Sequence, residues 1–156
     1  EKCFENGFLF YTTHASDPLP AAVGLKVLEI VLRDRLTDRA TAMGNRLRAG
    51  LEALQQRYEV IGDIRGRGLF RGVELVEDRA TKRPFDPAHK VNARIKAAAM
   101  ERGLMVYPMG GTIDGVNGDH VLLAPPFIAT EADLDEIVGR LAAAIETGTA
   151  AFRRAA

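Results

Sequence analysis

The feature that most constrains this chain is a long helical pattern of apolar residues between positions 38 and 58. These residues recur at spacings of three and four, which places them on one face of a helix. They are Ala40, Met43, Leu47, Leu51, Leu54 and Tyr58. Thr37 stands where an N-cap is expected. Such a helix measures roughly 30 Å, the span of a small domain, and we expect it to connect two domains.

Shorter elements are expected on both sides of this helix. Residues 20–35 carry another helical stripe, and the run 61–68 is rich in glycine and predicts a turn. Three strands and two helices are expected after it: strands at 69–76, 104–107 and 121–124, a helix from about Asp86 to Gly103, and a last helix opened by a capping box of Thr130 and Asp133. This order predicts an α+β fold, with helices on one face of a small sheet and a core drawn mainly from residues 58–147.

Charge and cysteine content narrow the class of partner. Lys plus Arg and Asp plus Glu both number 21 in the 156 residues, so no net field attracts a nucleic acid. The apolar runs are too short to cross a membrane. Cys3 is the single cysteine and cannot form an internal disulfide, which favours a reducing compartment. We therefore expect a cytoplasmic protein with small-molecule partners, no nucleic acid and no membrane.

Four stretches, in this order, resemble class III aminotransferases, which depend on pyridoxal phosphate. They are Thr13 to Ala22; Gly62 to Leu69 with Gly72 and Glu74; Arg102 to Leu104; and Leu123 to Phe127 with Thr130 and Glu131. The resemblance implies a homodimeric enzyme that moves an amino group from an amino acid or amine to a keto acid. It also implies that residues 58–156 are the C-terminal small α+β domain of a fold-type-I pyridoxal-phosphate enzyme. Residues 1–57 would then be a remnant of the large domain with the connecting helices.

The resemblance also implies roles for residues near the start of the chain. Thr13 matches a threonine that binds the phosphate of the cofactor in the neighbouring subunit; the alternative is a threonine in an ordinary turn or capping the next helix. Residues 11–26 are most similar to the dialkylglycine decarboxylases, which are decarboxylating transaminases. There, Asp17 with the carbonyls of Thr13 and Ala15 matches part of an alkali-metal site. Asp17 could instead cap the helix that begins near Pro20.

The chain departs from the family pattern at two places. Leu122 stands where the family commonly has an arginine that binds a substrate α-carboxylate. This leaves ω-amino acids or amines, or a carboxylate held by another residue, as donors. The Schiff-base lysine is expected upstream of Thr13, and neither Lys2 nor Lys26 matches its motif, so no catalytic residue is assigned. We expect this chain alone to be inactive. The alternative is a free-standing, non-catalytic α+β module for ligand binding or dimerisation.

Overall fold

The computed structural model describes Glu5 and residues 17–152. Their helices and strands, in chain order, are α2 (Pro18–Arg33), α3 (Leu36–Arg57), β1 (Ile61–Arg67), β2 (Phe70–Leu75), η1 (Pro87–His89), α4 (Val91–Glu101), β3 (Tyr107–Gly110), β4 (Asp119–Leu123), α5 (Glu131–Thr149) and η2 (Ala150–Phe152). Contacts group the chain into two compact units that divide after Thr37. Nearly all of α3 thus belongs with the sheet, while the division at 57/58 that we expect for a whole enzyme stays a prediction.

The first unit contains α2, which begins and ends close to the expected helix. Asp17 caps it by accepting a hydrogen bond from the Leu19 backbone N–H at 3.0 Å. The helix has no buried residue. Leu25, Leu28 and Leu32 are 70%, 60% and 77% exposed. An apolar helix that buries none of its side chains leaves a large hydrophobic surface uncovered.

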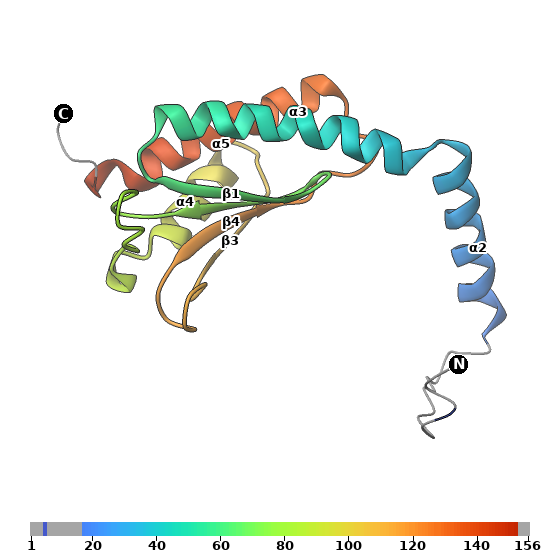
Figure 1. The fold of residues 1–156 in the computed structure, drawn as a ribbon, viewed down its shortest axis with the longest axis horizontal. Helices are drawn as coiled ribbons and strands as arrows, with labels where there is room; N and C mark the ends of the chain where they lie inside the picture. The colour runs from blue at the N-terminus through green and yellow to red at the C-terminus, as the bar shows by residue number, and fades with distance from the viewer. Residues whose placement is uncertain (1–4, 6–16, 153–156) are drawn as a thin grey trace. The chain divides into compact units, whose positions relative to one another are not determined.

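The second unit confirms the α+β prediction. Its four strands form one antiparallel sheet in the order β1-β2-β4-β3, and Figure 1 shows α3 and α5 together on one side of it. Alternate residues of β2 and β4 are buried, as a sheet covered on one face requires. The buried cluster joins α3, α4 and α5 to the sheet through residues that include Leu51, Ile95, Val121 and Ile145.

The strand β1 corrects the sequence prediction of a turn over residues 61–68. It pairs with β2 from Ile61↔Leu75 to Arg67↔Phe70, which leaves a two-residue loop of Gly68 and Leu69. Gly68 has φ 55°, and a glycine with positive φ at this first loop position is typical of a tight hairpin. The glycines that predicted a turn therefore lie in an edge strand and its hairpin loop.

Close contact between α3 and this hairpin requires glycine on both sides. A Cβ on Gly44 of α3 would lie 2.2 Å from the Gly68 carbonyl oxygen. The buried Arg71 side chain fastens the same contact, because its Nη1 donates to the Gly66 carbonyl at 2.6 Å and its Nη2 donates to the Gly44 carbonyl at 3.1 Å. Burial lowers the pKa of this guanidinium.

Two further boundaries differ from the sequence prediction. The strand expected at 104–107 begins only at Tyr107, since Leu104 packs into the core instead. The helix expected from Asp86 is divided: Asp86 caps η1, and α4 starts at Val91 after Lys90 in the left-handed conformation. The carboxylate of Asp119, from β4, caps α4 across the fold by accepting from the Asn92 backbone N–H at 3.3 Å and from its side-chain amide at 2.5 Å.

The last helix follows the prediction. The Thr130 hydroxyl accepts from the Asp133 backbone N–H, and the Asp133 carboxylate accepts from the Thr130 backbone N–H, so the expected capping box is present. Helices α4 and α5 pack tightly, because a Cβ on Gly148 would meet Ile95 at 2.6 Å. On the other side, Arg46 of α3 reaches Asp135 of α5 at 2.7 Å. The helical layer is thus held by both packing and surface ion pairs.

Candidate functional site

The face of the sheet away from the helices carries the side chains that the core does not use. Residues directly opposite each other in antiparallel strands project from the same face. One row across β1, β2, β4 and β3 consists of Asp63, Glu74, His120 and Met109. The next row, in the same strand order, consists of Arg65, Gly72, Leu122 and Tyr107. We refer to this surface, defined by the two rows, as the open face.

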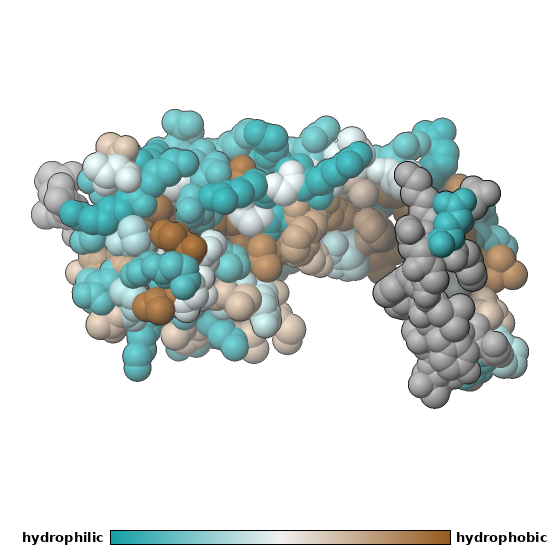
Figure 2. All heavy atoms as spheres, turned by 60° about the horizontal axis from the view of Figure 1, so that its bottom comes forward, coloured by the Kyte–Doolittle hydropathy of each residue, from teal (hydrophilic) through white to brown (hydrophobic). Residues whose placement is uncertain are grey.

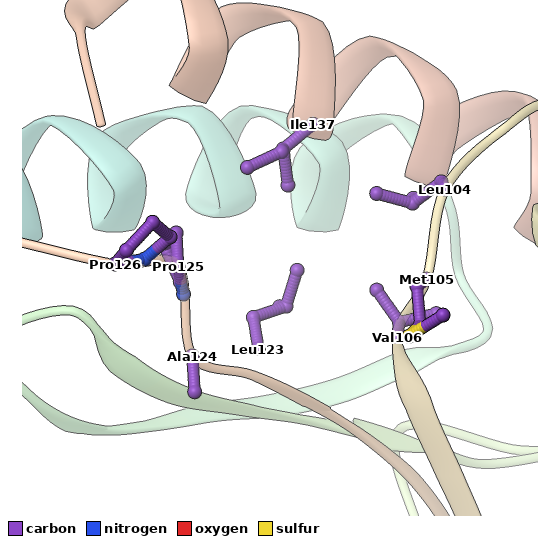
Figure 3. A pocket seen from close by; sticks show the side chains of 8 residues that line it. All are labelled: Leu104, Met105, Val106, Leu123, Ala124, Pro125, Pro126 and Ile137. Atoms are coloured by element: carbon purple, nitrogen blue, oxygen red, sulfur yellow. The ribbon is translucent and has the colours of Figure 1, made fainter. Parts of the chain in front are cut away.

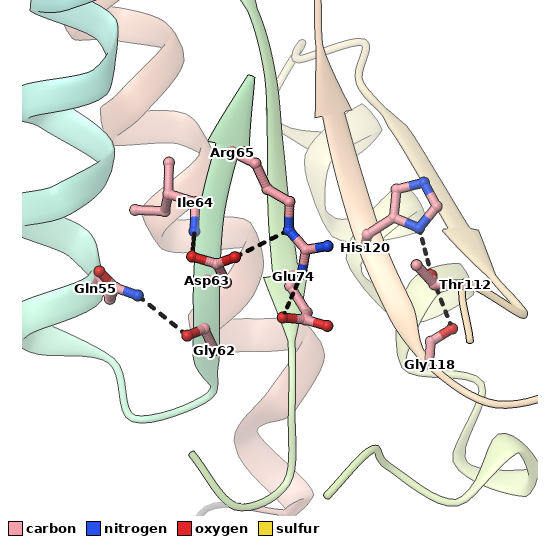
Figure 4. Close-up of polar contacts among 9 residues, drawn as sticks. All are labelled: Gln55, Gly62, Asp63, Ile64, Arg65, Glu74, Thr112, Gly118 and His120. Atoms are coloured by element: carbon pink, nitrogen blue, oxygen red, sulfur yellow. Dashed lines mark hydrogen bonds and ion pairs between the residues drawn. The ribbon is translucent and has the colours of Figure 1, made fainter. Parts of the chain in front are cut away.

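A charged network occupies the β1–β2 side of the open face. Arg65 donates through Nη2 to Glu74 at 2.7 Å, and its Nε lies 2.9 Å from Asp63. Figure 4 shows the Arg65 guanidinium between these two carboxylates. Both contacts reach the surface, so they are worth little individually. Their effect on the site is that the cation is already shared by two anions.

A second polar contact lies where β4 joins the loop that precedes it. The Thr112 hydroxyl is 2.6 Å from Nδ1 of His120 and also donates to the Gly118 carbonyl at 3.3 Å. Within the loop, Asp114 accepts from the Val116 and Asn117 backbone N–H groups and from the Asn117 amide. Hydrogen bonds from Asn117 are the largest cause that lowers the Asp114 pKa to about 2. The loop is therefore a tightly hydrogen-bonded turn.

Leu122 lies at the centre of the open face. It is directly opposite Gly72 on one side and Tyr107 on the other. A Cβ on Gly72 would touch the Leu122 side chain at 3.5 Å. Since Gly72 has no side chain, the surface beside Leu122 is low. The position that commonly carries arginine in the resembled family is therefore apolar here and faces outward from the sheet.

An apolar pocket of about 220 Å³ lies between the sheet and α5. The residues that line it are Leu104, Met105, Val106, Leu123, Ala124, Pro125, Pro126 and Ile137. Figure 3 shows Ile137 projecting from the helix toward Leu123 and Leu104. None of these side chains carries a group that could donate or accept a proton, so the pocket suits hydrophobic contact and no acid–base chemistry.

The loop after β4 is held by one side chain of α3. Arg39 donates to the carbonyls of Phe127 and Ala129 at 2.7 Å each. Phe127 and Ile128 remain exposed at the tip of this loop.

In the view of Figure 2, hydrophobic surface is interspersed with hydrophilic surface rather than forming one continuous apolar face.

Residues 6–145 match the family model described as "Aminotransferase class-III". This chain belongs to the class III aminotransferase family. The resemblance drawn from its sequence motifs is thereby confirmed. Among the described residues, the glycine-rich run forms the β1–β2 hairpin and the double proline follows the end of β4.

Individual aminotransferases agree with the family match. An uncharacterized aminotransferase of Schizosaccharomyces pombe is 44% identical over 146 residues, which is 94% of this chain and 31% of the relative. A taurine–pyruvate aminotransferase of Bilophila wadsworthia is 40% identical over 126 residues, or 81% of this chain and 27% of the relative. A crystal structure of a transaminase from the marine bacterium Virgibacillus has a TM-score of 0.83 at 31% identity, covering 92% of this chain and 31% of its own. The chain thus spans about three tenths of the length of these relatives.

The predicted cofactor and metal residues lie at the edge of what the structure describes. Thr13 and Ala15 fall outside the described residues. Asp17 is described, and it caps α2 as the alternative predicted. Among residues 17–152, no group of three or more His, Cys, Asp or Glu side chains is arranged to hold a metal ion. The cation site and the role of Thr13 therefore stay predictions.

Pyridoxal phosphate is the cofactor that membership of class III implies, and the described residues do not fit it. Lys26 forms an exposed ion pair with Glu29, while Lys82, Lys90 and Lys96 are exposed on a turn, a cap and a helix. None of these four lysines lines the pocket between the sheet and α5. This pocket thus offers no lysine for a Schiff base, and no chemical step is assigned to the described residues.

Within the described residues, no helix combines the length and apolar character that a membrane span requires. Two residues that hold segments around the sheet in place were not identified from sequence: Arg39 and Asp119. The partners of Arg39 are 88 to 90 positions away, and Asn92 is 27 positions from Asp119. No spacing rule connects such distant residues, so the sequence held no local signal for either contact.

Proposed function

We propose that this chain is part of a longer, pyridoxal-phosphate-dependent aminotransferase that moves an amino group from a donor to a keto acid such as pyruvate. The observation that carries the proposal is the family match over residues 6–145. The cofactor supplies the electron sink of such a reaction, and the protein binds and orients it. The residues that bind it would lie mainly outside the described part of this chain.

The exposed surface of α2 supports a part of a larger enzyme over a free-standing module. A self-contained module should cover the apolar side chains of its own helices, whereas α2 has no buried residue. The side chains of Leu25, Leu28 and Leu32 are exposed. Burying a leucine side chain fully would stabilise the protein by about 1.5–3 kcal/mol, and α2 does not gain this stabilisation here. Phe8, Phe10 and Tyr11, which would be exposed by the same reasoning, lie outside the described residues.

Leu122 supports a donor without an α-carboxylate at this wall of the site. A leucine cannot bind a carboxylate, whereas a guanidinium binds it through two parallel hydrogen bonds. We therefore propose ω-amino acids or amines as the donor class. Relatives whose names identify them as taurine–pyruvate aminotransferases are consistent with this, because taurine carries its amino group at the end opposite its acidic group.

Two residue roles and a cellular location belong to the same proposal. Thr13 would bind the phosphate of the cofactor held by the neighbouring subunit, which implies a homodimer. Asp17 would share an alkali-metal ion with the carbonyls of Thr13 and Ala15, and decarboxylation of some substrates would then accompany transamination. A cytoplasmic location is proposed from the single cysteine, Cys3.

The proposal is tested with the intact protein. The purified enzyme, supplied with pyridoxal phosphate, should form alanine from pyruvate and an ω-amino acid or amine, and should use α-amino acids poorly. The 156-residue chain alone should give neither a cofactor absorbance band nor amino transfer. If the intact protein transfers amino groups from none of the donors, the proposed function is refuted. A borohydride-reducible adduct at one specific lysine of the short chain would refute the assignment of its inactivity.

A further inference from the structure

Tyr107 lies beside Leu122 on the open face. A molecule that contacts Leu122 would therefore lie within reach of the Tyr107 side chain. The two residues are directly opposite each other in the β3–β4 ladder, so their side chains project from the same face about 5 Å apart at Cβ. Tyr107 is 61% exposed. Gly72 lies on the opposite side of Leu122 and has no side chain. The apolar surface formed by Leu122 is therefore bordered by a side chain on the Tyr107 side and is low on the Gly72 side.

The polar side chains of the open face differ in whether their polar atoms are already occupied. Arg65 is shared by Asp63 and Glu74, and His120 is bonded to Thr112. The Tyr107 hydroxyl, in contrast, has no hydrogen-bond partner among residues 17–152. This hydroxyl is therefore available to a molecule bound over Leu122, directly opposite Tyr107.

We propose that Tyr107 is a specificity-determining residue for the amino donor. Its hydroxyl would hydrogen-bond an acceptor oxygen at the end of the donor opposite the amino group, while the donor chain lies over Leu122 and Gly72. This inference rests on the proposed function, which puts Leu122 in the wall of the donor site. A phenol supplies one neutral hydrogen bond where a guanidinium would supply two charged ones. It therefore selects for an acceptor oxygen at the far end of the donor.

The experiment uses the intact enzyme and donors of equal chain length that end in sulfonate, carboxylate, hydroxyl or methyl. Tyr107→Phe removes only the hydroxyl. It should lower kcat/KM about tenfold for the three donors that end in oxygen, chiefly through KM, as the loss of one hydrogen bond predicts. It should leave the methyl-ended donor unchanged. The cofactor absorbance spectrum of the variant should match that of the wild type, which reports an intact fold and cofactor site.

Two other variants complete the test. Tyr58→Phe is the matched control, because it removes a phenol hydroxyl that donates to Glu146 in the helical layer, and it should leave the donor profile unchanged. Leu122→Arg should raise kcat/KM for the carboxylate-ended donor, which checks separately that position 122 faces the donor.

Each result has one interpretation. An equal loss for all four donors in Tyr107→Phe, or no loss for any, would overturn the role of Tyr107. If Leu122→Arg still favours the carboxylate in that case, the proposed function stands and only the inference fails. If the wild-type enzyme transfers amino groups from none of the donors, the proposed function fails and the inference falls with it.

Discussion

Replacing Gly44 with alanine should strongly destabilise the chain, although alanine is the better helix former. Helix propensity alone predicts a gain of about 1 kcal/mol for this change. The tertiary contact opposes it, because the new Cβ would lie 2.2 Å from the Gly68 oxygen and 2.3 Å from the Gly68 carbonyl carbon. Both atoms belong to the backbone of a hairpin loop, so relief requires α3 and the hairpin to move apart.

The magnitude follows from two losses. Forcing an extra carbon into a packed contact typically costs about 1–3 kcal/mol. Separation of the two elements also weakens the hydrogen bond from Arg71 to the Gly44 carbonyl, and bonds from charged donors contribute about 1.5–3 kcal/mol. After the propensity gain is subtracted, Gly44→Ala should lower the free energy of unfolding by about 1.5–5 kcal/mol.

The control is Gly139→Ala in α5, where nothing lies within 4 Å of the place that the new methyl group would occupy. That change should raise the free energy of unfolding by up to about 1 kcal/mol. Urea denaturation followed by circular dichroism measures both, and with a slope of about 1–3 kcal/mol/M the Gly44 variant should unfold at a midpoint lower by about 0.5 M or more. A Gly44→Ala chain as stable as the wild type would refute the reasoning.

Three smaller predictions follow. Thr130→Ala removes one half of the capping box with Asp133 and should lower the unfolding free energy by about 1 kcal/mol in the same assay; no change would mean that the box is not formed in solution. Asn117→Ala should raise the pKa of Asp114 from about 2 toward its ordinary value, as carbon-detected NMR titration can measure. Since the folded-state pKa is depressed, the contribution of Asp114 to stability is present above about pH 4 and is lost as the pH falls toward about 2; an unmoved pKa would contradict the role of the Asn117 amide. Ile145→Ala should cost about 2–5 kcal/mol because this side chain is fully buried, and a loss below about 1 kcal/mol would contradict its place in the core.

The sequence by itself determined most of the helices, the fold class and the family. Helices are stabilised by contacts between residues three and four apart and by caps within one turn, so their signals are local. The apolar stripe from Met43 to Leu54 and the Thr130–Asp133 capping box could therefore be predicted from the sequence. The family motifs are also short runs of sequence, and comparison with the family pattern, counted back from Pro125, identified the departure at Leu122.

Tertiary structure decided what lies next to what. The glycines of residues 61–68 predict a turn, but pairing with β2 makes most of this segment an edge strand. Asp119 caps a helix 27 positions away, and Arg39 holds a loop 88 positions away. The open face likewise exists only through register, which sets Tyr107 opposite Leu122. These contacts join residues that are distant along the chain, and their energies depend on packing that no local pattern of residues records.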